Sequence, residues 1–191
     1  MKWIVLSILV FIPLYTYLTL HYRRPGPAFN PYQDMRDRAD VLRLLKAGYQ
    51  RVALDASRPA DEVREAGAPS SPAPGGLPED LRNTLIETPL LPLEVNSVSA
   101  APTAVSGIEY RIVLDYTIPD NKRQLSGAHL YEKPGEIVIV ADFERLAGAL
   151  LSRTRDGAAL LDIPPGSLRP GTYHVTLVGE RASRSWTLRV R

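Results

Sequence analysis

The chain has 191 residues, a formal net charge of +2 and no cysteine. This length leaves room for one domain of about 100 residues beside the shorter segments that precede it. Acidic and basic residues are interspersed, so the chain lacks the basic stripe that nucleic acid requires, and we expect no nucleic-acid partner. The absence of cysteine excludes disulfides, thiolate metal sites and cysteine nucleophiles.

An uncharged apolar run covers residues 3–20. As a helix it would be roughly 27 Å long, which is close to the hydrocarbon thickness of a bilayer. We interpret residues 1–24 as a transmembrane anchor in the lipid bilayer. Its predicted membrane-interface residues are aromatic or basic, as is typical at the headgroups: Trp3, Tyr22, Arg23 and Arg24. A cleaved signal peptide is the alternative, but the run is long for one and no small-x-small site follows it.

The orientation of this anchor rests on two conflicting signals. Basic residues are more numerous after the run than before it, and the positive-inside rule then places the following domain in the cytoplasm. In contrast, the short start before the run, with Lys2, is typical of exported bacterial proteins. We expect a single-pass protein of a bacterial inner membrane with its β domain on the extracytoplasmic side, and the conflict stays open.

A second helix is predicted after the anchor, within a juxtamembrane segment over residues 25–55. Asn30 and Pro31 supply an N-cap and a proline at the first helical position. Gly48 can end the helix in a left-handed conformation, and residues 49–54 can then run extended.

One face of this predicted helix is apolar. The residues recur at spacings of four, three and three, which is the helical period: Met35, Ala39, Leu42 and Leu45. The stripe can pack on the β domain, lie along the bilayer, or dock on an integral membrane protein. All three predict the same periodicity, so we name the four residues as candidate partner-docking residues and leave the alternatives open.

Residues 56–80 are rich in proline, alanine and glycine and hold almost no large apolar side chain. Such a segment cannot bury enough surface to offset the entropy of ordering. We predict a linker there, followed by one domain over residues 81–191.

The period changes in this last domain from helical to alternating. The clearest alternation runs from Ile108 to Ile118, with apolar residues on one face and charged or polar ones on the other. Shorter candidate strands follow, separated by Pro-Gly turns: 129–132, 136–141, 158–163, 173–177 and 186–190. Residues 143–152 are either a short helix or an irregular crossover. About seven short strands in one domain indicate a β-sandwich.

The closing segment, residues 164–190, contains Leu168, the run Pro170–Tyr173 and a final alternating strand. It resembles the last hairpin of bacterial immunoglobulin-like domains on single-pass membrane-anchored proteins. The resemblance implies a fold and no functional residue. The expected fold class is therefore mainly β: a transmembrane helix, a short amphipathic helix, a linker and an Ig-like antiparallel β-sandwich.

No catalytic motif stands out. The histidines His21, His129 and His174 are too scattered for a zinc site. Asp115 and the pair Asp142 and Glu144 could be read as paired carboxylates, but they fall on a polar strand face and at a strand end, where acids are ordinary. Nucleotide-binding and hydrolase motifs are missing from the sequence. We expect no enzyme activity, no cofactor and no metal.

Two functional hypotheses follow. The first is a non-enzymatic binding or scaffold protein, an accessory or assembly subunit of an inner-membrane complex with an integral membrane protein as partner. The second is an envelope sensing or signalling protein whose β-sandwich binds a ligand, which a large apolar pocket would favour.

Overall fold

A computed structural model describes residues 2, 11–17, 31–59 and 70–191 of the chain. The chain divides into two units, Met1–Met35 and Arg36–Arg191. In the first unit, residues 11–17 are helical. Most of the predicted transmembrane run and its four interface residues lie outside the described residues. Within the described residues no helix is long and apolar enough to cross a membrane, so the predicted membrane-spanning helix has no support there.

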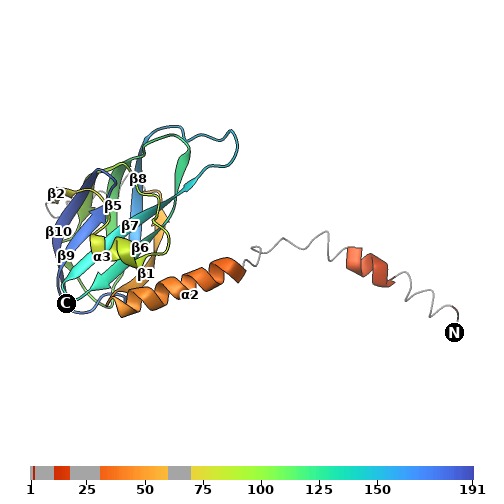
Figure 1. The fold of residues 1–191 in the computed structure, drawn as a ribbon, viewed down its shortest axis with the longest axis horizontal. Coiled ribbons are helices and arrows are strands. Elements are labelled where there is room, and N and C mark those ends of the chain that lie inside the picture. Colours follow the sequence, from red (N-terminus) through yellow and green to blue (C-terminus); the bar gives the residue numbers. More distant parts are fainter. Residues whose placement is uncertain (1, 3–10, 18–30, 60–69) are drawn as a thin grey trace. The chain divides into compact units, whose positions relative to one another are not determined.

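The second unit consists mainly of β-strands (Figure 1). The strands are β1 Gln50–Ser57, β2 Ser71–Pro74, β3 Glu94–Ala100, β4 Thr103–Ala104, β5 Tyr110–Thr117, β6 Arg123–Lys133, β7 Glu136–Arg145, β8 Asp156–Ile163, β9 Gly171–Val178 and β10 Ala182–Val190. Two helices complete the unit, the C-terminal part of α2 Pro31–Lys46 and the short α3 Glu79–Thr84. The strands predicted after residue 108 lie at these positions, and several are longer than predicted.

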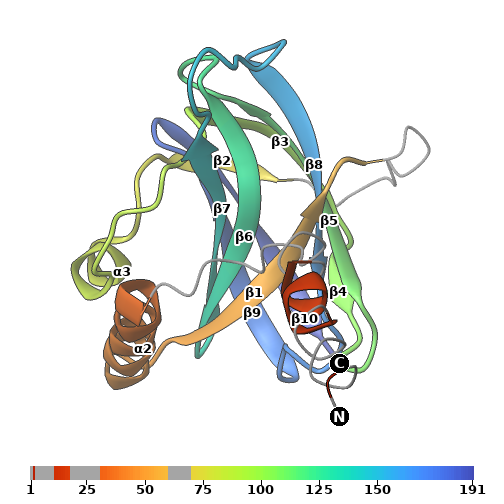
Figure 2. The same ribbon diagram turned by 90° about the vertical axis from the view of Figure 1, so that its right-hand side faces the viewer.

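Eight of the strands form a closed barrel (Figure 2). Their order is β10-β3-β5-β8-β1-β6-β7-β9, and β9 pairs with β10 again to close the ring. The short strands β2 and β4 add to β10 outside this ring. The barrel is mixed, because β7 and β9 are parallel, as are β10 and β3, while the other neighbours in the ring are antiparallel.

The prediction of an Ig-like antiparallel β-sandwich, and with it the resemblance to immunoglobulin-like domains, is wrong. The reason is β1, which the sequence analysis placed outside the β domain. This strand lies between β6 and β8 and pairs with both, Gln50 opposite Glu132 at one end and Ser57 opposite Leu160 at the other. The other seven strands already form one continuous sheet through the β9–β10 pairing, and β1 joins its two edges, β6 and β8, into a ring. A sandwich would instead consist of two separate sheets.

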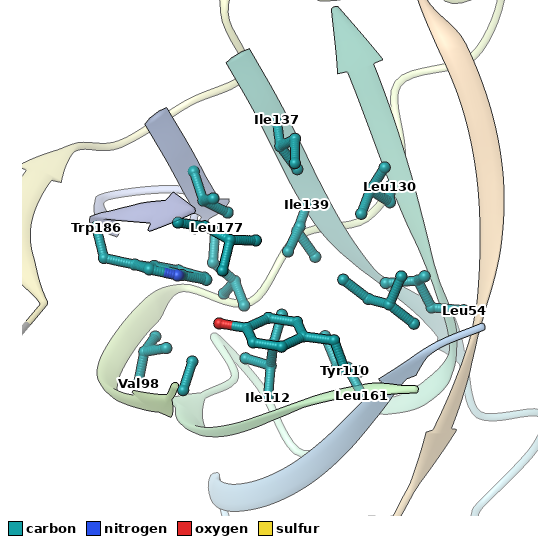
Figure 3. Packing of buried hydrophobic residues seen from close by; sticks show 14 of the residues in the cluster. Leu54, Val98, Tyr110, Ile112, Leu130, Ile137, Ile139, Leu161, Leu177 and Trp186 are labelled. Carbon is teal, nitrogen blue, oxygen red and sulfur yellow. The ribbon is translucent and has the colours of Figure 1, made fainter. Parts of the chain in front are cut away.

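Alternation along the strands fills the barrel with apolar side chains (Figure 3). In β5 the residues Tyr110, Ile112 and Leu114 point inward and are buried, while Arg111 is exposed. Figure 3 shows Leu130, Ile139, Leu161, Leu177 and Trp186 converging on the same interior. The described interior is therefore a packed core.

The described part of α2 ends as the sequence predicts. Gly48 has φ +83°, and its amide donates to the carbonyl of Leu45 at 3.1 Å. The amide of Tyr49 donates to the carbonyl of Leu44 at 2.8 Å. These two bonds are the Schellman pattern, which a glycine in the left-handed region permits. The chain then enters β1 directly.

Both helices cover the outer wall of the barrel over β6, β7 and β9. Leu44 of α2 and Leu81 of α3 are buried in one apolar cluster with Tyr131, Val138 and Val178. Near its end β6 is thus buried on both faces, with Leu130 in the core and Tyr131 beneath the helices.

The segment predicted as a linker is divided in the structure. Its middle, residues 60–69, lies outside the described residues. Its two ends form the last residues of β1, the strand β2 and the start of α3. The alternative of a helix over residues 143–152 is not observed, because Phe143 lies in β7 and residues 146–155 are irregular.

Candidate functional site

The outward face of α2 is the most apolar exposed surface that the sequence singled out. We define it as Arg38, Val41, Leu42 and Leu45, which are spaced i, i+3, i+4 and i+7 and so lie on one side of the helix. The side chains of Val41, Leu42 and Leu45 are 43%, 61% and 59% exposed. Two leucines at this level of exposure, one turn apart, form an apolar strip in contact with solvent.

The other candidate docking residues take different positions. Ala39 is half-buried. Met35 is 65% exposed and belongs to the first of the two units, so it is described separately from the outward face.

Among the described side chains of α2, Leu44 is the large residue that is buried against the barrel. Leu44 is 1% exposed and contacts the cluster that contains Tyr49 and Tyr131. A polar contact also ties this helix to the segment after α3, since the amide of Ile86 donates to Oδ1 of Asp40 at 2.8 Å. These contacts hold α2 with Leu42 and Leu45 turned toward solvent.

The apolar stripe of this helix was predicted from the sequence, but its anchor Leu44 was not. Periodicity shows that a helix has an apolar face, but it does not say which face meets the domain. A usable signal was present at the helix end. In a Schellman motif the residue directly after the glycine is commonly apolar, and it packs on an apolar residue four positions before the glycine. Tyr49 and Leu44 are that pair.

The two described histidines have different surroundings. Nε2 of His129 lies 2.8 Å from Nη2 of Arg51. Because arginine only donates hydrogen bonds, Nε2 must accept, and Nδ1 then carries the hydrogen and donates to Asp142. Both ring nitrogens are engaged, so this imidazole is not available as a general base. His174 is exposed on β9, as expected.

The acidic residues considered as a pair are not brought together. Asp142 lies on β7 and Asp115 on β5, and the strands β8, β1 and β6 separate them in the barrel. Asp115 accepts a hydrogen bond from Ser97 at 2.6 Å, and Glu144 accepts one from Gln124. Each carboxylate thus has a local polar partner.

Pockets in the described part of the chain lie at the surface and at the barrel ends. The described residues contain no group of three or more histidine, cysteine or acidic side chains placed to hold a metal ion. The large apolar pocket that would favour the sensing hypothesis is not seen there, because the interior is filled by the core.

Comparison of the chain with protein-family models, with curated proteins and with solved structures gives no match.

Proposed function

We propose that this chain is a non-enzymatic accessory protein that binds a partner protein through the outward face of α2. The observation that carries the proposal is the exposure of Leu42 and Leu45 on a helix that Leu44 fixes to the barrel. An isolated exposed leucine is common, but adjacent ones on a preset helix face are the usual anchors of helix-in-groove recognition.

The chemistry of this face favours a protein over a lipid surface. Interfacial helices usually insert aromatic side chains among their apolar residues. The described side chains of the outward face include no aromatic group, and Lys46 stands exposed beside Leu45 and Leu42. A partner groove with an apolar floor and an acidic rim would match this combination.

Two other described features also fit a binding role better than a catalytic one. The imidazole of His129 is held by Arg51 and Asp142, and the barrel interior is packed. A rigid barrel that presents a helix is suited to positioning a docking surface.

The test is co-purification of the tagged full chain from its native cells, followed by reconstitution with the purified partner. We expect a stoichiometric complex whose dissociation constant rises at least tenfold in the double variant Leu42→Asp with Leu45→Asp. Loss of two apolar anchors and the introduction of two acids facing an acidic rim both weaken binding.

The matched control is Val105→Asp with Ile108→Asp, which changes two other exposed apolar residues, 52% and 63% exposed. It should bind the partner as the wild type does. Equal binding by the Leu42/Leu45 double variant would contradict the proposal. Binding of the chain to anionic lipid vesicles that the same double variant abolishes, with no protein partner recovered, would assign the face to a membrane surface instead.

A further inference from the structure

A pocket of about 360 Å³ lies at one end of the barrel. Its walls come from the start of β1, the β6–β7 turn and the segment that leads into β9. Its lining residues include Gln50, Glu132, Arg169 and Tyr173. This pocket is separate from the outward face of α2, none of whose residues line it.

Glu132 is the unusual residue in this pocket. Along β6 the inward positions are Ala128, Leu130 and Glu132, so an acid occupies the place of a core side chain. Glu132 is only 6% exposed. Charged residues are rarely buried to this extent unless they are paired.

The two carboxylate oxygens of Glu132 have different surroundings. Oε1 accepts a hydrogen bond from the hydroxyl of Tyr173 at 2.9 Å. Oε2 is buried and has no hydrogen-bond partner among the described residues. Because buried polar atoms are almost always hydrogen-bonded, the unpaired oxygen of a residue that lines a pocket indicates a donor supplied by a ligand.

The cations nearest the pocket are directed elsewhere. Nζ of Lys133 lies 3.3 Å from Asp80 on α3. Arg169 donates to the side-chain oxygen of Gln50 at 2.9 Å, and its carbonyl is 3.0 Å from the hydroxyl of Tyr173. Within the described residues, Glu132 makes no ion pair, so its charge is not neutralised by the protein.

The geometry selects among possible donors. A guanidinium group binds a carboxylate best through both oxygens, and Tyr173 already occupies Oε1. A metal ion needs several oxygen ligands, and the described residues provide no such cluster. A neutral hydroxyl would leave a buried charge uncompensated. An ammonium group is a compact charged donor that needs one oxygen.

We propose that this pocket binds a primary ammonium group, which donates to Oε2 of Glu132. Two sources carry this chemistry, a free small amine and the amino terminus or lysine of a peptide. The proposal does not depend on the docking function of α2, and its failure would leave that function untouched.

The experiment is an NMR titration of the isotope-labelled full chain with ethylammonium, following the amides of Glu132, Gly135 and Tyr173. We expect saturable shifts at these positions. Tetramethylammonium is the charge-matched control probe, because it has no N–H to donate and should not bind. Equal binding of both cations, or no saturable binding of ethylammonium, would overturn the proposal.

The variant Glu132→Gln keeps an acceptor for Tyr173 and removes the charge, so ethylammonium should bind at least tenfold more weakly. Asp142→Asn is the matched control, since it removes a sheltered carboxylate from the outer wall, and it should bind normally. Unchanged binding by Glu132→Gln would contradict the proposal. The comparison of the two cations on the wild type decides the question even if a variant does not fold.

A short peptide with a free amino terminus, compared with its acetylated form, distinguishes the two sources. Tighter binding of the free peptide than of ethylammonium would assign the pocket to a polypeptide amine. Tighter binding of ethylammonium would assign it to a small molecule.

Discussion

The two ends of the barrel are closed in opposite ways. At one end the last inward side chains are aromatic, and the rings of Tyr116 and Phe143 meet edge to face with their centroids 5.1 Å apart. At the other end the inward series of β6 finishes in Glu132, whose neighbour is the hydroxyl of Tyr173. The aromatic end gains apolar contact, while the acidic end buries a charge that costs folding energy. If the proposed ammonium site is right, the first end serves stability and the second serves recognition.

The largest expected effect follows from removing the aromatic closure. Phe143→Ala deletes a ring that is 5% exposed and leaves a cavity beside Tyr116 and Ile118. We expect the free energy of unfolding to fall by about 3–5 kcal/mol, measured by denaturant titration of the full chain. A loss below about 1 kcal/mol would mean that the ring does not close this end.

A smaller loss is expected from crowding the same end. Gly157 faces Tyr116 across β5 and β8, and a Cβ at this position would lie 2.7 Å from the ring. Gly157→Ala should therefore cost about 1–3 kcal/mol through displacement of the ring. In a Tyr116→Leu background, Gly157→Ala should lower the free energy of unfolding by less than it does in the wild type. An equal loss in both backgrounds would show that the ring of Tyr116 is not what crowds position 157.

The tyrosine hydroxyls at the two ends, Tyr173 and Tyr116, should also ionise at different pH. Burial, together with the hydrogen bond to Glu132 and its charge, raises the pKa of Tyr173 to about 12. Burial raises the pKa of Tyr116 too, but the charge of Arg58 opposes that rise. A raised folded pKa means that stability present below pH 10 is lost as the pH rises toward 12. Burial also raises the pKa of Tyr110 and of Tyr131 to about 12, so absorbance titration should show one fewer phenol ionising near pH 12 in Tyr173→Phe than in Tyr116→Phe.

The smallest effect on stability is expected at the acidic end. Glu132→Gln removes a buried charge and keeps an acceptor for Tyr173, so the free energy of unfolding should change by less than about 1 kcal/mol or should increase. Denaturant titration of Glu132→Gln and Phe143→Ala under the same conditions compares the two losses in free energy of unfolding directly. A loss as large as that of Phe143→Ala would make Glu132 a structural residue.

Local signals in the sequence were enough to place many elements. Gly48 predicted the end of α2 because only a residue that tolerates positive φ suits that turn. The alternation from Tyr110 to Tyr116 predicted the buried face of β5. These features depend on a few neighbouring residues, and neighbouring residues are what a single sequence displays.

The closure of the barrel depends on partners far apart in the chain. Residues 49–54 were expected to run extended, but nothing in their period says that β6 and β8 flank the strand that they form. Glu132 was overlooked for a related reason, since an acid at the end of a strand looks like a surface residue. The available signal was its position two and four residues after Leu130 and Ala128. Alternate residues of a strand share a face, so this spacing places the acid on the inward face.

Both barrel ends exist as described only if β1 pairs with β8, so the most direct test is to trap that pairing. The chain has no cysteine, and Asp55 lies opposite Asp162 in the two strands. Asp55→Cys with Asp162→Cys places two thiols on antiparallel partners roughly 5 Å apart at Cα, within reach of a disulfide. We predict rapid oxidation of this pair in the folded protein and little in the offset pair Ala53→Cys with Asp162→Cys. Equal oxidation of both pairs, or of neither, would contradict the closed barrel.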